Sequence, residues 1–209
     1  MRVAIVDYHA GNLRNVQKAI ERLDRKADVV QRGNELAAAD AIVLPGVGAF
    51  GHGMEHLAQR GFVDAIRREV LEKGKPILGI CLGMHLMGEL GFEGGEIRGL
   101  GLVPATVPRF KVAAKGIRLP HNGWNSIDIS PDTVLFKGVP QGADFYFVHS
   151  YHVACDDPTM VAALCTYGYP FPAALERGNI FATQFHPEKS QRHGLRLLEN
   201  FLSHCEREG

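Results

Sequence analysis

The chain of 209 residues lacks the features by which several classes of protein are recognised. It has no excess of charge, since 23 lysines and arginines match 23 aspartates and glutamates, and it contains no basic block. Nothing in this balance would attract nucleic acid or an anionic membrane, so neither is an expected partner. The N-terminal apolar run, residues 3–6, ends at Asp7 and is far too short for a signal peptide or a membrane span.

Cysteines are also few. Cys81, Cys155, Cys165 and Cys205 are scattered, without a CxxC pair and without the spacing of metal ligands. A disulfide framework is therefore not expected in a chain of this size, and we expect neither a metal nor another cofactor. The simplest location for such a chain is the reducing cytoplasm.

The composition that remains is that of an ordinary globular protein. Apolar residues make up 45% and charged residues 22%, which suits one domain spanning residues 1–209. In the first half, apolar strand-like runs alternate with helical patterns, which predicts an α/β fold with a parallel sheet covered on both faces. The predicted strands are 2–7, 27–30, 41–44 and 77–80, and the predicted helices are 13–23 (capped by Asn12), 61–73 and 82–90.

The second half has a different pattern. Residues 97–185 contain short strand-like runs separated by Gly, Pro, Asn and Asp, and we interpret them as antiparallel or mixed extensions of the same sheet. The runs are 127–129, 145–148, 161–165 and 180–184. A last helix, roughly 191–206, places Leu195, Leu198, Phe201 and Leu202 on one face.

The sharpest local feature is Gly79-Ile80-Cys81-Leu82-Gly83, between an apolar strand and a helix. A nucleophile on such a tight bend needs glycine two positions away on each side, because a Cβ would clash there. The helix N-terminus behind Cys81 favours the reactive thiolate, and the N–H of Leu82 is a candidate oxyanion donor. The alternative is that Cys81 is a small buried core residue.

A second candidate group, His186-Pro187-Glu188, follows the apolar run 180–184. Alternate side chains of an extended segment point to the same side, so Glu188 can accept a hydrogen bond from His186 and fix its tautomer. The other ring nitrogen then faces a nucleophile, while Pro187 keeps the spacing rigid. A His-Pro-Glu alone can also occur in a surface loop, but together with Cys81 it completes a nucleophile, a base and a carboxylate.

The loop after the third predicted strand, residues 45–51, contains a GxGxxG match. A dinucleotide-binding fold is a rival interpretation, but the match does not follow the first strand. The acidic partner expected about 20 residues later is missing as well, because Glu69 and Glu72 fall within a predicted helix. An exposed glycine-rich segment with N–H groups pointing into a pocket is the other use of this loop, and an ordinary turn is the plainest one.

Five segments together resemble one known family. They are LPGVGAFG (44–51), GICLGM (79–84), PHNGWN (120–125), YFVHSYH (146–152) and ATQFHPEKS (182–190). In this order, over nearly the whole chain, they are similar to the glutaminase subunits of imidazole glycerol phosphate synthase, within the class I, triad-type glutamine amidotransferases. The cysteine elbow and the His-Pro-Glu are shared across that class, and the other segments single out this subunit.

The resemblance implies a three-layer α/β/α, flavodoxin-like fold with a mostly parallel central sheet. It implies that Cys81 attacks the side-chain amide of glutamine to form a thioester, that His186 transfers protons, and that Glu188 orients His186. It further implies that the Val47-Gly48 peptide and Leu82 stabilise the oxyanion. Gly48, Ser150 and Tyr151 would line the glutamine pocket.

The resemblance also implies a partner. A separate (β/α)8-barrel cyclase subunit would receive the ammonia and make imidazole glycerol phosphate and an aminoimidazole carboxamide ribotide in histidine biosynthesis. Trp124, Asn125, Tyr146 and Lys189 would lie at the interface of this heterodimer, with Lys189 pairing to an acidic residue of the barrel. Trp124 has a plainer interpretation as a buried core residue, since an exposed tryptophan is costly without a partner.

Two positions depart from the family pattern. Asn122 replaces the usual methionine inside PHxGWN, and His85 replaces a glutamine that contacts the substrate four residues after the nucleophile. An imidazole with a reference pKa of about 6.5 loses its acceptor on protonation. We therefore expect the KM for glutamine to rise as the pH falls through this range, unless His85 only fills space.

Three rivals to this function remain at the level of sequence. One is a stand-alone cysteine hydrolase of the same fold, although His-Pro-Glu after a late strand is not the arrangement of those enzymes. Another is a degenerate, inactive amidotransferase domain, which the intact Cys81, His186 and Glu188 disfavour. The third is the glutaminase of a different synthase, which PHNGWN and PGVGAFG disfavour.

Overall fold

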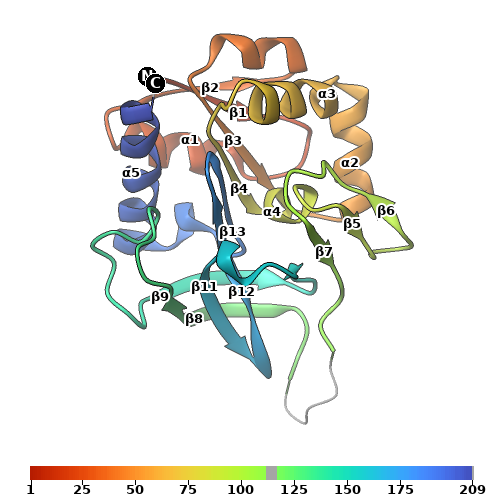
Figure 1. Cartoon of the computed structure of the whole chain (residues 1–209), viewed down its shortest axis with the longest axis vertical. Coiled ribbons are helices and arrows are strands. Elements are labelled where there is room, and N and C mark those ends of the chain that lie inside the picture. Colours follow the sequence, from red (N-terminus) through yellow and green to blue (C-terminus); the bar gives the residue numbers. More distant parts are fainter. Residues whose placement is uncertain (112–116, 209) are drawn as a thin grey trace.

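The computed structural model describes residues 1–111 and 117–208, and a nine-stranded sheet forms its centre (Figure 1). The strand order is β2-β1-β3-β4-β13-β12-β11-β8-β9. Strands β2 to β13 in this order run parallel, and the remaining neighbours pair antiparallel. The parallel strands are β1 (Arg2–Val6), β2 (Lys26–Val30), β3 (Ala41–Gly46), β4 (Ile77–Cys81) and β13 (Ile180–Thr183). The antiparallel strands are β8 (His121–Ile129), β9 (Asp144–His149), β11 (Val161–Tyr167) and β12 (Tyr169–Arg177).

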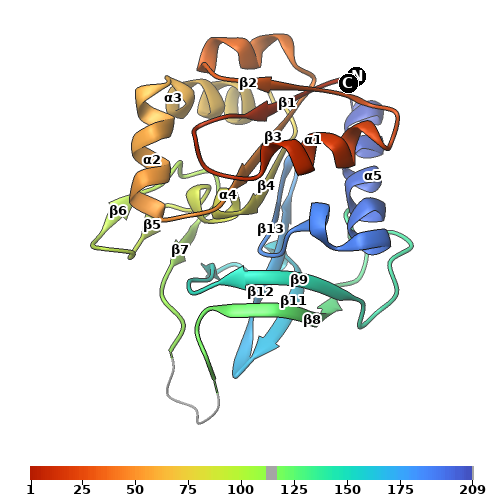
Figure 2. The ribbon, with the colours of Figure 1, turned by 180° about the vertical axis from the view of Figure 1, so that it is seen from behind.

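Helices cover both faces of the parallel half of the sheet. Alternate strand residues point to opposite faces, so Val3 and Ile5 pack in one hydrophobic cluster while Ala4 and Val6 pack in another. The first cluster includes α1 (Leu13–Glu21) and α5 (Gln191–Glu208). The second includes α2 (Phe50–Gln59), α3 (Phe62–Arg67), which continues as a π-helical turn Arg68–Glu72, and α4 (Leu82–Leu86). The expected three-layer α/β architecture is thus confirmed (Figures 1 and 2).

A small second sheet lies beside α2 and α4. Its order is β10-β7-β5-β6, built from β10 (Ala154–Cys155), β7 (Ala105–Val107), β5 (Leu90–Gly91) and β6 (Ile97–Arg98). Short 3₁₀ turns complete the described elements: η1 (Gly33–Ala38), η3 (Pro158–Met160) and η4 (Pro187–Lys189). None of the helices in the described part of the chain has the length and apolarity needed to cross a membrane.

Several sequence predictions of elements are confirmed and several are wrong in detail. Asn12 does cap α1, accepting a hydrogen bond from the backbone of Asn15 at 3.3 Å. The predicted helix 82–90 ends at Leu86, because the chain turns there into β5. The run 180–184 is confirmed as a mixed extension of the sheet, because β13 pairs parallel with β4 on one side and antiparallel with β12 on the other. The small second sheet was not predicted.

Candidate active site

Cys81 lies at the junction of β4 and α4, which forms the expected elbow. Its backbone has φ 53° and ψ −107°, a conformation that non-glycine residues rarely adopt outside functional sites. A Cβ on Gly79 would come within 2.7 Å of the Met87 sulfur, and a Cβ on Gly83 would collide with the Leu44 carbonyl. The two flanking glycines are therefore required by the packing of the bend.

His186 and Glu188 form the expected pair. His186 Nδ1 and Glu188 Oε1 are 2.8 Å apart, and both side chains are only 3% exposed. Burial opposes protonation of His186, but Cys81 and Glu188 outweigh it and raise the pKa of His186 to about 9. Among the described residues, His186 Nε2 has no hydrogen-bond partner, so this nitrogen is free to exchange protons with a substrate beside Cys81.

The backbone around His186 is fixed to the neighbouring strand β9. The N–H of His186 donates to the carbonyl of Tyr146 at 3.0 Å, and the N–H of Tyr146 donates to Ser190 Oγ at 3.1 Å. Ser190 Oγ in turn donates to the carbonyl of His186 at 2.6 Å. The backbone of His186 is thus held by strand β9, which also carries Tyr146, one of the expected interface residues.

The candidate oxyanion segment lies beside the nucleophile. Gly46 pairs with Cys81 in register, so Val47 and Gly48 follow directly next to the elbow. Gly48 has φ +113°, which favours glycine, and Val47 is 43% exposed. The N–H of Leu82 stands at the start of α4, where N–H groups lack partners within the helix. The expected donors are therefore close to Cys81.

The expected substrate residues Ser150 and Tyr151 follow the end of β9. The Val148 carbonyl, just before this turn, accepts a weak hydrogen bond from Cys81 Sγ at 3.9 Å. The Ser150 carbonyl accepts from the N–H of Phe110 at 3.1 Å. The turn therefore lies next to the nucleophile, as a glutamine pocket would require.

The pH expectation for His85 is wrong. The side chain is buried, and His85 Nε2 lies 2.7 Å from Gln184 Oε1. Burial lowers the pKa of His85 to about 4, against a smaller opposing effect of Gln184. His85 therefore stays neutral across the imidazole range, and the KM for glutamine should not rise there on its account.

Gln184 is a residue that sequence reasoning missed. It is fully buried, and its Nε2 lies 3.9 Å from Cys81 Sγ while its Oε1 faces His85. Gln184 therefore connects the nucleophile to His85 through its side-chain amide. The available signal was a polar side chain at the end of an apolar strand, two residues before His186.

The four expected interface residues gather near the β8–β9 edge of the sheet. Trp124 is 49% exposed, which contradicts its interpretation as a buried core residue, and its ring lies 6.0 Å from that of Tyr146. Lys189 Nζ stands 5.6 Å from the centre of the Tyr146 ring. Asn122, the departure from the family methionine, accepts a hydrogen bond from Tyr146 OH at 3.0 Å. Asn125 follows Trp124 in β8 and points to the opposite face, where it is half-buried beside His121.

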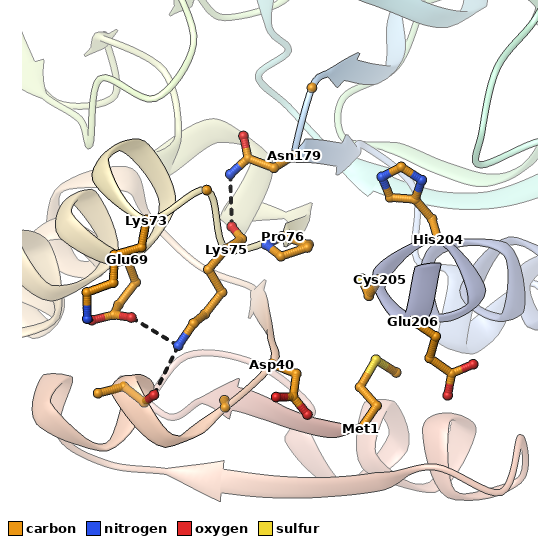
Figure 3. A pocket seen from close by; sticks show the side chains of 14 residues that line it. Met1, Asp40, Glu69, Lys73, Lys75, Pro76, Asn179, His204, Cys205 and Glu206 are labelled. Atoms are coloured by element: carbon orange, nitrogen blue, oxygen red, sulfur yellow. Dashed lines mark hydrogen bonds and ion pairs between the residues drawn. The ribbon is translucent and has the colours of Figure 1, made fainter. Parts of the chain in front are cut away.

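A cavity of about 890 Å³ lies elsewhere, at the amino ends of the parallel strands (Figure 3). Its lining includes Met1, Asp40, Glu69 and Lys75. Glu69, whose side chain is 1% exposed, accepts a hydrogen bond from Lys73 at 2.9 Å and forms a second ion pair with Lys75, whose Nζ lies 3.0 Å from Glu69 Oε2. Burial opposes ionisation of Glu69, but the two lysines outweigh it and lower its pKa. The charge of Glu69 is therefore balanced within the protein by two neighbouring lysines.

A cysteine on a strand–helix elbow, with a histidine and carboxylate pair beside it, is the arrangement of enzymes that transfer acyl groups through a thioester. The family model for "Glutamine amidotransferase class-I" matches residues 4–205. The chain belongs to this family of enzymes.

Within this family, the chain is similar to subunits of one particular enzyme. The imidazole glycerol phosphate synthase subunit HisH of Moorella thermoacetica is 47% identical over 95% of this chain and 93% of its own length. The subunit of the same name from Chlorobaculum tepidum is 48% identical over 95% of this chain and 98% of its own. A solved glutamine amidotransferase superposes with a TM-score of 0.75 at 22% identity, covering 97% of this chain and 98% of its own, which shows the shared fold.

Proposed function

We propose that this chain is the glutaminase subunit of an imidazole glycerol phosphate synthase. It would hydrolyse L-glutamine to L-glutamate and ammonia, acting as a single domain. The observation that carries this proposal is the free Nε2 of His186 beside the elbow cysteine, with Glu188 bound to the other ring nitrogen. The identity to HisH subunits over nearly the full length of both chains supports the choice of synthase.

The chemistry follows in two halves. With a pKa of about 9, His186 is mainly protonated at neutral pH, and an imidazolium beside Cys81 stabilises the thiolate. The thiolate attacks the side-chain amide carbon of glutamine, and the N–H groups of Leu82 and of the Val47-Gly48 segment bind the oxyanion. His186 gives its proton to the departing ammonia and leaves a thioester on Cys81.

Water completes the cycle. Neutral His186 takes a proton from a water molecule that attacks the thioester carbon, and the S–C bond breaks to release glutamate. The proton then rests on His186 and the thiolate is restored, so no other reactant is needed. Glu188 keeps the imidazole in one tautomer and stabilises its positive charge in both halves.

The ammonia acceptor requires a second protein. We propose a heterodimer with a (β/α)8-barrel cyclase subunit that binds the surface around Trp124, Tyr146 and Lys189, with Asn125, on the opposite face of β8, as a further contact. A tryptophan that is 49% exposed, beside a half-buried tyrosine, is the kind of aromatic pair that dominates binding at interfaces. We also propose a cytoplasmic location, which the four free cysteines support.

The test compares glutamate production from glutamine by the purified chain alone, with the barrel subunit, and with the barrel subunit and its nucleotide substrate. We expect a slow basal rate and a large increase with the complete partner. Full turnover by the single chain would refute gating by the partner. Turnover of peptides or aldehydes instead of glutamine would support the stand-alone hydrolase, and no turnover in any mixture would support a degenerate domain.

A further inference from the structure

Two buried histidines connect the exposed β8–β9 strands to the turn beside the nucleophile. Asn125 Nδ2 lies 3.3 Å from His121 Nε2, and His121 Nδ1 lies 3.0 Å from His149 Nε2. His149 Nδ1 lies 2.8 Å from the carbonyl oxygen of Tyr151. Three hydrogen bonds in series therefore run from the half-buried amide of Asn125 to the backbone of Tyr151.

The direction of this series is fixed from both ends. The Tyr151 carbonyl can only accept, so His149 carries its proton on Nδ1 and accepts on Nε2. His121 must then donate from Nδ1 and accept on Nε2. From the other end, Asn125 Nδ2 also contacts the Thr166 carbonyl at 3.1 Å, which identifies it as the amide nitrogen and a donor to His121. Both ends demand the same pair of tautomers.

The surroundings keep both rings neutral and immobile. His121 is stacked between Phe147 and Tyr167, with ring centroids 4.8 Å and 4.0 Å away. Burial lowers the pKa of His121 to about 4 and that of His149 well below its ordinary value. A second proton on either ring would place two donors face to face, so the series is intact only while both rings are neutral.

The far end of the series is the peptide between Tyr151 and His152. Its carbonyl is bound by His149, and its N–H donates to the Pro108 carbonyl at 3.1 Å, so both polar atoms of this peptide are fixed. Removing His149 from the carbonyl would leave a part-buried acceptor unpaired, which costs up to about 3 kcal/mol and would let the turn shift.

We propose that His121 and His149 are positioning residues that hold the Ser150–Tyr151 turn in the geometry that binds glutamine, with Asn125 setting the direction of their hydrogen bonds. This inference rests on the proposed glutaminase function. Neither histidine touches the reacting atoms: each acts through the Tyr151 carbonyl.

Asn125→Asp is the sharpest variant, because it keeps the shape and replaces the donor by a charged acceptor. A carboxylate can only accept, so a neutral His121 would have to donate from Nε2 and accept on Nδ1, and His149 would donate to it from Nε2. An imidazolium at His121 would keep the series intact, so the variant is assayed at a pH where its ¹⁵N shifts show one proton on His121. His149 Nδ1 would then present a lone pair to the Tyr151 carbonyl and the last bond would be lost. His121→Phe is the second variant, since it retains the ring stacking and removes both hydrogen bonds. Asn200→Asp is the control, because Asn200 donates to the backbone carbonyls of Leu135 and Lys137, away from this turn.

The first measurement is the ¹⁵N chemical shift of the imidazole nitrogens in the isolated chain. We expect both His121 and His149 to carry the proton on Nδ1 in the wild type, whereas free histidine favours Nε2. In Asn125→Asp we expect His121 to carry it on Nε2. An Nε2–H tautomer at either ring in the wild type would overturn the direction of the series.

The second measurement is steady-state glutamine hydrolysis with the barrel subunit present. We expect the KM for glutamine to rise about tenfold in Asn125→Asp and His121→Phe, about 1.4 kcal/mol, with kcat within about twofold and Asn200→Asp unchanged. An unchanged KM, or a loss confined to kcat, would refute the positioning role. Absence of turnover in the wild type would overturn the proposed function instead. The ¹⁵N measurement of the two tautomers would still test the direction of the hydrogen bonds.

Discussion

Buried polar groups are arranged in opposite ways at the two ends of the parallel strands, called here the carboxyl edge and the amino edge. At the carboxyl edge, Cys81 sits in a rarely populated conformation and His186 Nε2 is buried without a hydrogen-bond partner among the described residues. At the amino edge, the Glu69 carboxylate is equally buried, but its charge is balanced by ion pairs with Lys73 and Lys75 (Figure 3). An unpaired buried group and a strained backbone destabilise a fold and are typical of functional sites. A buried carboxylate that is paired with lysines has no need of a ligand to balance its charge.

This difference shows why a hollow alone is a poor guide to a functional site. The cavity of about 890 Å³ belongs to the amino edge, where Lys75 also donates to the Leu36 carbonyl at 2.6 Å and ties η1 to the sheet. The reactive groups, Cys81 and His186, lie at the carboxyl edge. We therefore expect substitutions at the carboxyl edge to change activity more than stability, and substitutions at the amino edge to do the reverse.

The largest effect should come from His186. His186→Ala should lower kcat for glutamine about 10⁴-fold, because this residue transfers protons in both halves of the reaction. Glu188→Ala should lower it only about 10²-fold, because Glu188 orients the imidazole and stabilises its charge. Steady-state assays with the barrel subunit present give both values, and urea unfolding checks that the variants stay folded. Equal losses in the two variants would contradict this division of roles.

At the amino edge, Lys75→Met should lower the free energy of unfolding by about 3 kcal/mol, because it breaks a buried ion pair and frees the Leu36 carbonyl. The matched control is Lys73→Met, whose side chain is 54% exposed and whose ion pair should contribute at most about 1 kcal/mol. Urea unfolding measures both, and glutaminase activity per folded molecule should be unchanged. Similar losses of stability, or a loss of activity in the folded variant, would break the comparison between the edges.

The smallest effect concerns the pH dependence of stability. An unfolded histidine binds a proton near pH 6.5, whereas buried His85 does so only at a pKa of about 4. The unfolded state thus binds more protons between these values, and stability falls as the pH drops through this window. His85→Gln should reduce the loss between pH 7 and pH 5 by about 2 kcal/mol, measured by urea unfolding at both values. Parallel losses in wild type and variant would show that His85 is not held neutral by burial.

Much of the fold could be read from local patterns, since apolar strands, glycines at the elbow and the cap at Asn12 are each specified within a few residues. The partners of His85 and His121 could not, because Gln184 and His149 lie far away in sequence and meet them only in the folded sheet. The reference pKa for His85 failed for the same reason, since burial is a property of the packed structure. The end of α4 at Leu86 was missed because the second sheet that replaces the expected helix consists of strands of two or three residues.

The central claim is that Cys81 is the nucleophile that glutamine reaches. The most direct measurement treats the chain, with its barrel subunit, with a diazo-oxo analogue of glutamine, and locates the covalent adduct by peptide mass spectrometry. The account predicts one adduct on Cys81, no adduct and no glutaminase activity in a folded Cys81→Ala variant, and unlabelled Cys155, Cys165 and Cys205. Labelling at one of those three cysteines, or glutamine turnover that survives Cys81→Ala, would contradict it.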